Sequence, residues 1–290
     1  MADIINEELK TRQTLSTGIN ILDKKINGIH NGEVILYAGR PDMGRHSLAL
    51  KCAYQNALFF QQQNSKKNVL FFNNFMSARN DLVEMLLEQH LEAISSIDFN
   101  KMYFTINHIE KLPLYFYRSI GTIDNLSKII HQFVASSINI GLIIIEEWLL
   151  IQADPHSYNK ELVASKIKEI ASDLNIPIIL TSCLCCEVEY RADKRPVLND
   201  ISSYGNALIF IDKIIFLYRD IYYLKQKIKT KKFRKGTKEQ YKQRLANWKK
   251  ICSEAENKCE LIVAKNSFDD LGTVLCHYDP ETKVIKDSEV

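Results

Sequence analysis

Val34-Ile-Leu-Tyr-Ala-Gly39-Arg-Pro-Asp-Met-Gly44-Arg-His-Ser47 is an apolar segment that runs into a loop bounded by two glycines. The spacing of Gly39 and Gly44 matches the P-loop, G-x-x-x-x-G-K-[ST], whose backbone N–H groups wrap a phosphate. That motif uses its lysine to reach the β- and γ-phosphates and its hydroxyl to hold Mg²⁺. Here Arg45 stands at the lysine position and His46 at the hydroxyl position. The stretch predicts a P-loop, with an ordinary tight turn as the alternative, and leaves nucleotide hydrolysis open.

Expected strands and helices alternate along the chain, which predicts an α/β fold with a largely parallel central sheet flanked by helices. A chain of 290 residues accommodates one such domain with an insertion. Apolar runs predict strands at 34–38, 68–72, 103–106, 114–117, 141–145, 176–180, 213–218, 260–264 and 272–276. Apolar residues at helical spacing predict helices at 47–63, 78–90, 123–136 and 162–175.

The composition, with 46% hydrophobic and 25% charged residues, is that of an ordinary globular protein. No apolar run approaches the roughly 20 residues of a membrane span, and the acidic N-terminus is unlike a signal peptide. We therefore expect a cytoplasmic protein without membrane contact. The seven cysteines lack the spacing of a disulfide framework, which favours reduced thiols. Cys183 and Cys186 have C-x-x-C spacing without a second ligand pair, so we expect no zinc and interpret this cluster as small buried thiols.

Positive charge is concentrated in one part of the chain. Residues 225–250 contain twelve Lys or Arg and one acid, for a net charge of +11, while the remaining residues sum to −8. This window lies in a segment at about 221–258 that interrupts the expected strands. We predict a basic helical insertion there, with a break at Gly236-Thr237 and with Phe233, Tyr241 and Trp248 among its charges.

Several segments resemble one known family in the same order. They are 17–20 with Leu22-Asp23, 39–44, 141–145, 174–178, 191–196 with Asp200, and 218–220. Together they resemble the C-terminal RecA-like ATPase domain of DnaB-type replicative DNA helicases, and 191–196 is the most specific match. The resemblance implies a RecA-like P-loop core at 14–282, after a lead segment at 1–13 and before a tail at 283–290. It also implies that the family's N-terminal helical domain is missing.

The resemblance implies a site for ATP and Mg²⁺ at the P-loop. Arg45 keeps the positive charge of the family's lysine, but its longer, planar side chain cannot sit in the same position. His46 offers an imidazole to a cation that prefers oxygen ligands, and Ser47 is rotated by about 100° along the helix. We therefore expect nucleotide and metal binding to be weak or absent. The implied nucleotide-binding residues are Gly39, Arg40, Pro41, Asp42, Met43, Gly44, Arg45, His46 and Ser47.

The implied catalytic acids also depart from the family. Phe75 stands where the family carries the glutamate that activates water, and a phenyl ring cannot polarise water. Glu146 replaces the aspartate that holds Mg²⁺ and is a candidate to hold the ion through water. Glu147 beside it is the candidate replacement base. The alternative for both carboxylates is solvated charge at the edge of the sheet.

Two more catalytic positions are altered relative to the family. The polar sensor after the next strand is replaced by Cys183. Of the pair that reaches a neighbouring subunit's nucleotide, Lys265 remains as a candidate, while Ser267 replaces the arginine finger. Loss of an arginine finger alone costs on the order of 10³-fold in rate. These losses together predict that ATP hydrolysis is lost or strongly impaired.

Two segments are candidates for contact with nucleic acid. Residues 200–205 match the family's central-channel loop, but Ser202 and Ser203 replace its charged pair, which leaves the backbone near Gly205 for phosphate contact. The basic insertion could neutralise phosphates and stack its aromatic rings on bases. The alternatives are an acidic protein partner or a solvated hairpin whose aromatic residues pack back on the domain. The candidates in the insertion are Lys231, Lys232, Arg234, Lys235, Lys242 and Arg244.

Three functions fit these observations. The first is a degenerate DnaB-like protein that binds single-stranded DNA, helicase subunits or copies of itself in a ring, without efficient ATP turnover. The second is an active helicase in which Arg45, Glu146, Glu147 and Lys265 have taken over the catalytic roles. The third is a regulatory module that binds no nucleotide. Nucleotide binding separates the third function from the others, and turnover separates the first from the second.

Overall fold

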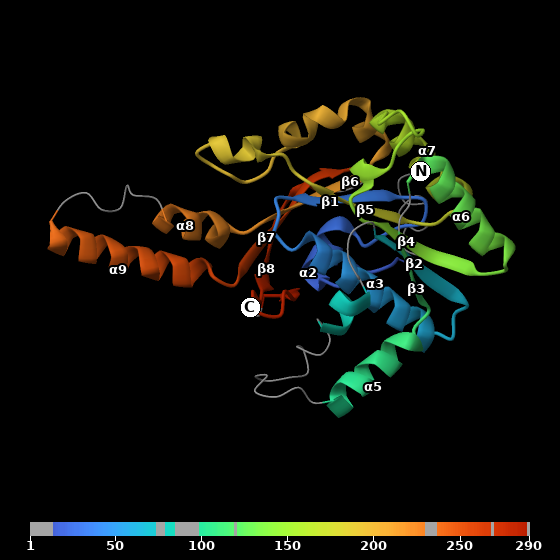
Figure 1. Ribbon diagram of the computed structural model, residues 1–290, viewed down its shortest axis with the longest axis horizontal. Helices are drawn as coiled ribbons and strands as arrows, with labels where there is room; N and C mark the ends of the chain where they lie inside the picture. Colours follow the sequence, from blue (N-terminus) through green and yellow to red (C-terminus); the bar gives the residue numbers. More distant parts are fainter. Residues whose placement is uncertain are drawn as a thin grey trace.

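The computed structural model describes residues 14–73, 79–84, 99–118, 121–229, 237–267 and 270–288, which form an α/β fold around a nine-stranded sheet (Figure 1). The strand order is β3-β2-β4-β5-β1-β6-β7-β8-β9; the strands up to β6 are parallel, and the last three are antiparallel. The expected largely parallel α/β fold is confirmed. The strands are β1 (Val34–Gly39), β2 (Lys67–Asn73), β3 (Leu114–Arg118), β4 (Asn139–Ile145), β5 (Ile178–Cys183), β6 (Lys213–Tyr218), β7 (Lys258–Asn266), β8 (Gly272–Tyr278) and β9 (Ile285–Asp287).

Strand β1 is central because both of its faces are apolar. All six of its residues are buried, and it pairs in parallel with β5 and β6. Successive side chains point to opposite faces of a sheet. Ile35 and Tyr37 therefore join one hydrophobic core, while Val34 and Leu36 join the other. The loop that follows β1 is thus fixed to the most buried strand of the molecule.

Helices cover both faces of the sheet (Figure 1). Residues of α2, α3 and α5 contribute to one core, and residues of α6, α7 and η3 contribute to the other. No helix in the described residues is long and apolar enough to cross a membrane. The helices are α2 (Asn20–Ile26), α3 (Arg45–Gln62), α5 (Phe99–Glu110), α6 (Ile123–Ala135), α7 (Lys160–Asp173), α8 (Asp220–Lys229) and α9 (Lys238–Ala255), with 3₁₀ helices η1 (Trp148–Leu150), η2 (Cys186–Tyr190) and η3 (Leu198–Phe210).

One expected strand is a helix in the structure. The strand predicted at 103–106 lies inside α5, which spans Phe99–Glu110. Apolar residues at positions 99, 102, 103, 106 and 109 recur at helical spacing. The buried Ile109 belongs to the same hydrophobic core as Ile35 and Tyr37 of β1. The short apolar run alone did not distinguish the two structures. Of the helix predicted at 78–90, residues 79–84 are helical, and the others lie outside the described residues.

The last strands extend the sheet and bring it back to the start of the fold. β9 falls inside the segment predicted as a tail, and it pairs antiparallel with β8. The carboxylate of Asp287 accepts the backbone N–H groups of Asn20 (3.1 Å) and Ile21 (2.9 Å). The N-cap residue of α2, Ile19, provides no side-chain cap. Asp287 therefore supplies the acceptor that the first turn of α2 lacks.

The basic insertion is helical, as predicted. Helices α8 and α9 follow β6 and precede β7, and both project beyond the sheet (Figure 1). Thr237 caps α9, since its hydroxyl accepts the N–H of Gln240 while the Gln240 side chain accepts the N–H of Thr237. The break predicted at Gly236-Thr237 therefore coincides with the start of α9.

Candidate functional site

The loop from Gly39 to Gly44 joins β1 to α3 at the carboxyl edge of the parallel sheet. Gly39 approaches β6 so closely that a Cβ there would lie 2.9 Å from the carbonyl oxygen of Leu217. Gly44 has a φ of 96°, and a Cβ would lie 2.9 Å from the ring of Tyr278. Both glycines are therefore required by local packing, and Gly44 also by its backbone conformation.

Side chains from neighbouring elements hold this loop in place. The Arg219 guanidinium donates to the carbonyl of Asp42 (2.9 Å) and lies 3.6 Å from the ring centroid of Tyr278. Arg40 donates through Nε to Glu189 (2.9 Å) and through Nη1 to the carbonyl of Leu184 (2.7 Å). Arg40 is therefore already bound to the segment after β5.

Arg45, at the lysine position of the motif, forms an ion pair with Glu147. Glu147 follows β4 in the left-handed region (φ 51°, ψ 54°), and its N–H donates to the Thr181 hydroxyl (3.1 Å). Its second carboxylate oxygen accepts the N–H of Cys183 (3.1 Å). The candidate base and the P-loop cation are thus bound to each other. Their side chains are 24% and 15% exposed.

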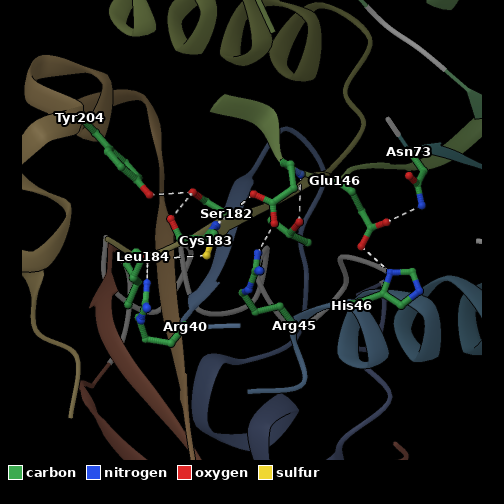
Figure 2. A network of polar contacts seen from close by, with 11 residues as sticks. Arg40, Arg45, His46, Asn73, Glu146, Ser182, Cys183, Leu184 and Tyr204 are labelled. Carbon is green, nitrogen blue, oxygen red and sulfur yellow. Dashed lines mark hydrogen bonds and ion pairs between the residues drawn. The ribbon is translucent and has the colours of Figure 1, made fainter. Parts of the chain in front are cut away.

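His46 lies between two carboxylates, and Figure 2 shows its contact with one of them, Glu146. Its Nδ1 is 2.6 Å from Oε1 of Glu146, and its Nε2 is 3.1 Å from Oδ2 of Asp81. Burial lowers the pKa of His46, but the hydrogen bond and charge of Glu146 and the charge of Asp81 outweigh it, so the pKa is raised. The amide of Asn73 donates to the other oxygen of Glu146 (2.8 Å). Both oxygens of Glu146 are therefore occupied.

Glu146 is buried, with 8% of its surface exposed, so the interpretation of this residue as solvated edge charge is wrong. Asn73 and Asp81 were not predicted as site residues. Asn73 is the last residue of β2. A polar residue at the carboxyl end of a buried parallel strand is a sequence signal for a site residue, because ligands bind at this edge of such sheets. Asp81 carries no such signal, because only the packing of residues 79–84 brings it to His46.

Lys265, the remaining candidate catalytic residue, lies apart from the P-loop. Lys265 pairs with Ile214 near the opposite edge of the sheet, where Nζ donates to the carbonyls of Leu208 (2.8 Å) and Ile211 (2.5 Å). Burial lowers its pKa. The role of Lys265 toward a neighbouring subunit stays a prediction. The loss of the water-activating glutamate at Phe75 also stays a prediction, because Phe75 lies outside the described residues.

The cysteine cluster differs from expectation. Cys185 and Cys186 are exposed and Cys183 is half-buried, so the interpretation as buried thiols is wrong. The buried stretch of β5 ends at Ser182, whose hydroxyl contacts the Tyr204 hydroxyl (2.6 Å), and the chain then leaves the sheet. All seven cysteines are free thiols. No group of His, Cys, Asp and Glu in the described residues is arranged to hold a metal ion.

The segment with the most specific family match stabilises the edge of the sheet. Arg191 binds the carboxylate of Asp200 through two nitrogens, each at 2.9 Å. Arg195 binds Glu260 of β7 in the same way, at 2.7 Å twice, and lies 5.0 Å from the ring centroid of Tyr218. These bidentate pairs connect the loop at 191–196 to η3 and to β7. In this structure, the residues of the family match therefore hold neighbouring elements together.

The predicted nucleic-acid residues are only partly described. Gly205 makes the kink in η3 (φ 58°, ψ −136°), and a Cβ there would meet open space. Lys242 and Arg244 are exposed on α9, while Tyr241 and Trp248 are half-buried on the same helix. The other predicted residues of the insertion, Phe233, Lys231, Lys232, Arg234 and Lys235, lie outside the described residues.

Comparison with known proteins agrees with the fold. Residues 14–287 match the model of the DnaB-like helicase C terminal domain. The chain is 30% identical to the replicative DNA helicase DnaB of Rickettsia felis, over 92% of this chain and 56% of that protein. The corresponding values for Geobacillus stearothermophilus DnaB are 28%, 90% and 53%. The chain thus spans a little more than half the length of these relatives.

Two solved structures share the fold. One, described as an ATPase domain, superposes with a TM-score of 0.76 at 22% identity, over 99% of this chain and 97% of that one. A DnaB-like replicative helicase, described with its interactions with primase, superposes with a TM-score of 0.75 at 22% identity, over 99% and 67% of the two chains.

Proposed function

Because this chain belongs to the family of DnaB-like helicase C-terminal domains, we propose that it is a replication protein that has lost efficient ATP hydrolysis. In this proposal it is a degenerate member of the family. It binds single-stranded DNA, helicase subunits or copies of itself, and the P-loop is kept for its structure.

The ion pairs at the P-loop carry this proposal. Phosphoryl transfer needs a cation on the γ-phosphate, Mg²⁺ beside it and a carboxylate that positions water. Arg45 is bound to Glu147, and His46 is bound to Glu146, so each group that could act on a nucleotide neutralises another. A nucleotide must break the Arg45 pair before its phosphate gains a cation. Binding is therefore weak, and an attacking water has no unpaired base.

One observation favours the alternative of an active helicase. Arg45 and Glu147, its phosphate ligand and its base, contact each other at the P-loop. Arg is a competent phosphate ligand, so phosphate could replace Glu147 and release it to act as the base. This second function differs from the first in one measurable property, which is turnover.

The decisive experiment measures ATP turnover with and without single-stranded DNA. The control is the double variant Glu146→Ala, Glu147→Gln, which exposes contaminating activity. We expect the wild-type rate to equal that of the double variant. DNA-stimulated turnover that the double variant lacks would contradict the proposal and establish the rewired helicase.

The α8–α9 hairpin is the proposed contact with single-stranded DNA. Its described cations Lys242 and Lys249 lie seven residues apart, on one face of α9, and both are exposed. Each lysine that neutralises a phosphate adds about one unit to the slope of log affinity against log salt. A row of such side chains on a projecting helix favours a polyanion over a compact acidic partner.

The charge reversal Lys242→Glu, Lys249→Glu tests this contact. We expect weaker DNA binding and a salt slope smaller by about 2. Lys24→Glu, Lys111→Glu removes the same charge from two exposed lysines outside the hairpin. Equal losses in the two variants would show that net charge alone controls binding. The same reversal of Lys231, Lys232, Arg234 and Lys235 extends the test, and unchanged affinity and slope there would contradict the DNA contact.

The proposed protein partners are helicase subunits or further copies of this chain. One similar structure is that of a DnaB-like replicative helicase with its interactions with primase. By the family resemblance of the sequence, this chain would contribute its P-loop edge and Lys265 to an interface between subunits. Co-elution of this chain with a replicative helicase, or self-association above a monomer, would support the proposal.

A further inference from the structure

We propose that the His46 ring takes the place of magnesium in this P-loop site, so that the site binds no divalent cation. This inference rests on the proposed function, because it explains how the fold keeps its P-loop edge without the ion. The side chains that carry it, all within the described residues, are those of His46, Glu146, Asp81, Asn73 and Ser47.

The His46 ring lies between two acids that converge at the P-loop. Both ring nitrogens face carboxylate oxygens, at 2.6 Å for Glu146 and 3.1 Å for Asp81. The ring therefore fills the space between Glu146 and Asp81 and contacts both carboxylates at once.

His46 also stands in the position that the motif reserves for a metal ligand. In a P-loop this residue is the hydroxyl that binds Mg²⁺, and the acid after the central strand completes the metal shell. Here the ring itself contacts that acid, Glu146. The contact that a metal would make with Glu146 is thus made by a side chain that cannot leave.

The other groups do not fit magnesium. Mg²⁺ requires oxygen ligands in near-octahedral geometry and keeps several waters. Glu146 has one oxygen on His46 and the other on Asn73 (2.8 Å). Ser47, the nearest remaining hydroxyl along the chain, is buried. An arriving ion would have to displace the imidazole of His46 and the amide of Asn73 from Glu146, and Ser47 offers no exposed hydroxyl to replace them.

Thermal unfolding of the wild-type chain tests the inference with ADP as the probe. The midpoint is measured with ADP in excess magnesium and with ADP in EDTA. We expect equal midpoints, whether or not ADP itself binds. A Mg–ADP complex at about 100 times its Kd would raise the midpoint of this 290-residue chain by roughly 4–5 °C. Such a rise with ADP in magnesium, but not with ADP in EDTA, would overturn the inference.

The variant His46→Thr restores the hydroxyl of the motif. We expect its midpoint to be lower than that of the wild type in EDTA and to recover in magnesium with ADP. His108→Thr is the matched control, because His108 lies on α5 and contacts Tyr54 away from the P-loop. Should His46→Thr not fold, the wild-type comparison decides alone.

Failure of this inference is distinct from failure of the proposed function. A magnesium-dependent midpoint without ATP turnover would overturn the metal-free site and leave the loss of hydrolysis intact. Turnover in EDTA would contradict the proposed function and leave the metal-free site intact.

Discussion

Ion pairs lie at both ends of the parallel strands, and their burial differs. At the amino edge, Lys213 of β6 binds Glu33 at 2.8 Å, and the two side chains are 1% and 6% exposed. At the carboxyl edge, the pairs of Arg45 with Glu147 and of His46 with Glu146 contain side chains from 10% to 38% exposed. Ligands of open α/β sheets bind at the carboxyl edge. The difference teaches that the ion pair at the amino edge is closed off from solvent, whereas the pairs at the edge where such sheets bind ligands stay partly accessible.

Among substitutions in these ion pairs, Lys213→Met should lower the free energy of unfolding the most. It leaves Glu33 buried without its cation and removes the donor to the carbonyl of Gly28 (2.9 Å). Loss of one partner from a buried pair costs about 3–5 kcal/mol of unfolding free energy. Urea unfolding measures the loss. The double variant Lys213→Met, Glu33→Gln should regain part of it, and a loss below about 1 kcal/mol in the single variant would erase the contrast between the edges.

Arg45→Ala should cost less, although it also breaks an ion pair. Glu147 is partly exposed and keeps its second oxygen on the N–H of Cys183. Loss of one hydrogen bond to a partly solvated charge costs about 1 kcal/mol. The same urea titration applies, with Glu147→Gln as its companion. A loss as large as that of Lys213→Met would mean that the P-loop pair is part of the structural core.

Lys166→Ala should change the free energy of unfolding the least. Lys166 pairs with Asp124 at 2.5 Å between α7 and α6, but the side chains are 36% and 71% exposed. Solvent screening limits such pairs to about 0.5 kcal/mol or less. We expect an unfolding free energy within error of the wild type. A larger loss would show that exposure does not rank these pairs. Lys128→Ala, which removes the exposed lysine of α6, controls for the helix surface.

Much of the fold was predictable from local pattern. The buried run before Gly39 and the glycine spacing identified β1 and its loop, and the charge window identified the α8–α9 hairpin. The strand predicted at 103–106 was wrong because four apolar or β-branched residues fit both periods. β9 was missed because a strand of three residues leaves no periodic pattern.

The candidate site was predictable as a set of positions and not as a set of contacts. The sequence identifies Arg45, His46, Glu146 and Glu147 because they occupy motif positions. It does not show that Arg45 meets Glu147 across 102 residues, nor that Asp81 approaches His46. Those pairings depend on how β4 and residues 79–84 pack beside the loop, and side-chain chemistry at one position does not encode that packing.

The central place of β1 has a consequence for synthesis. β1 is among the first strands to leave the ribosome, but its partners β5 and β6 come later, and Val34 pairs with Ile178, 144 positions downstream. At about 5–20 residues per second, the strand waits roughly 7–30 seconds for that partner. During this time its six residues, all buried in the finished fold, have no strand beside them. Until the middle of the sheet closes, β1 is therefore an exposed apolar segment in the newly made chain.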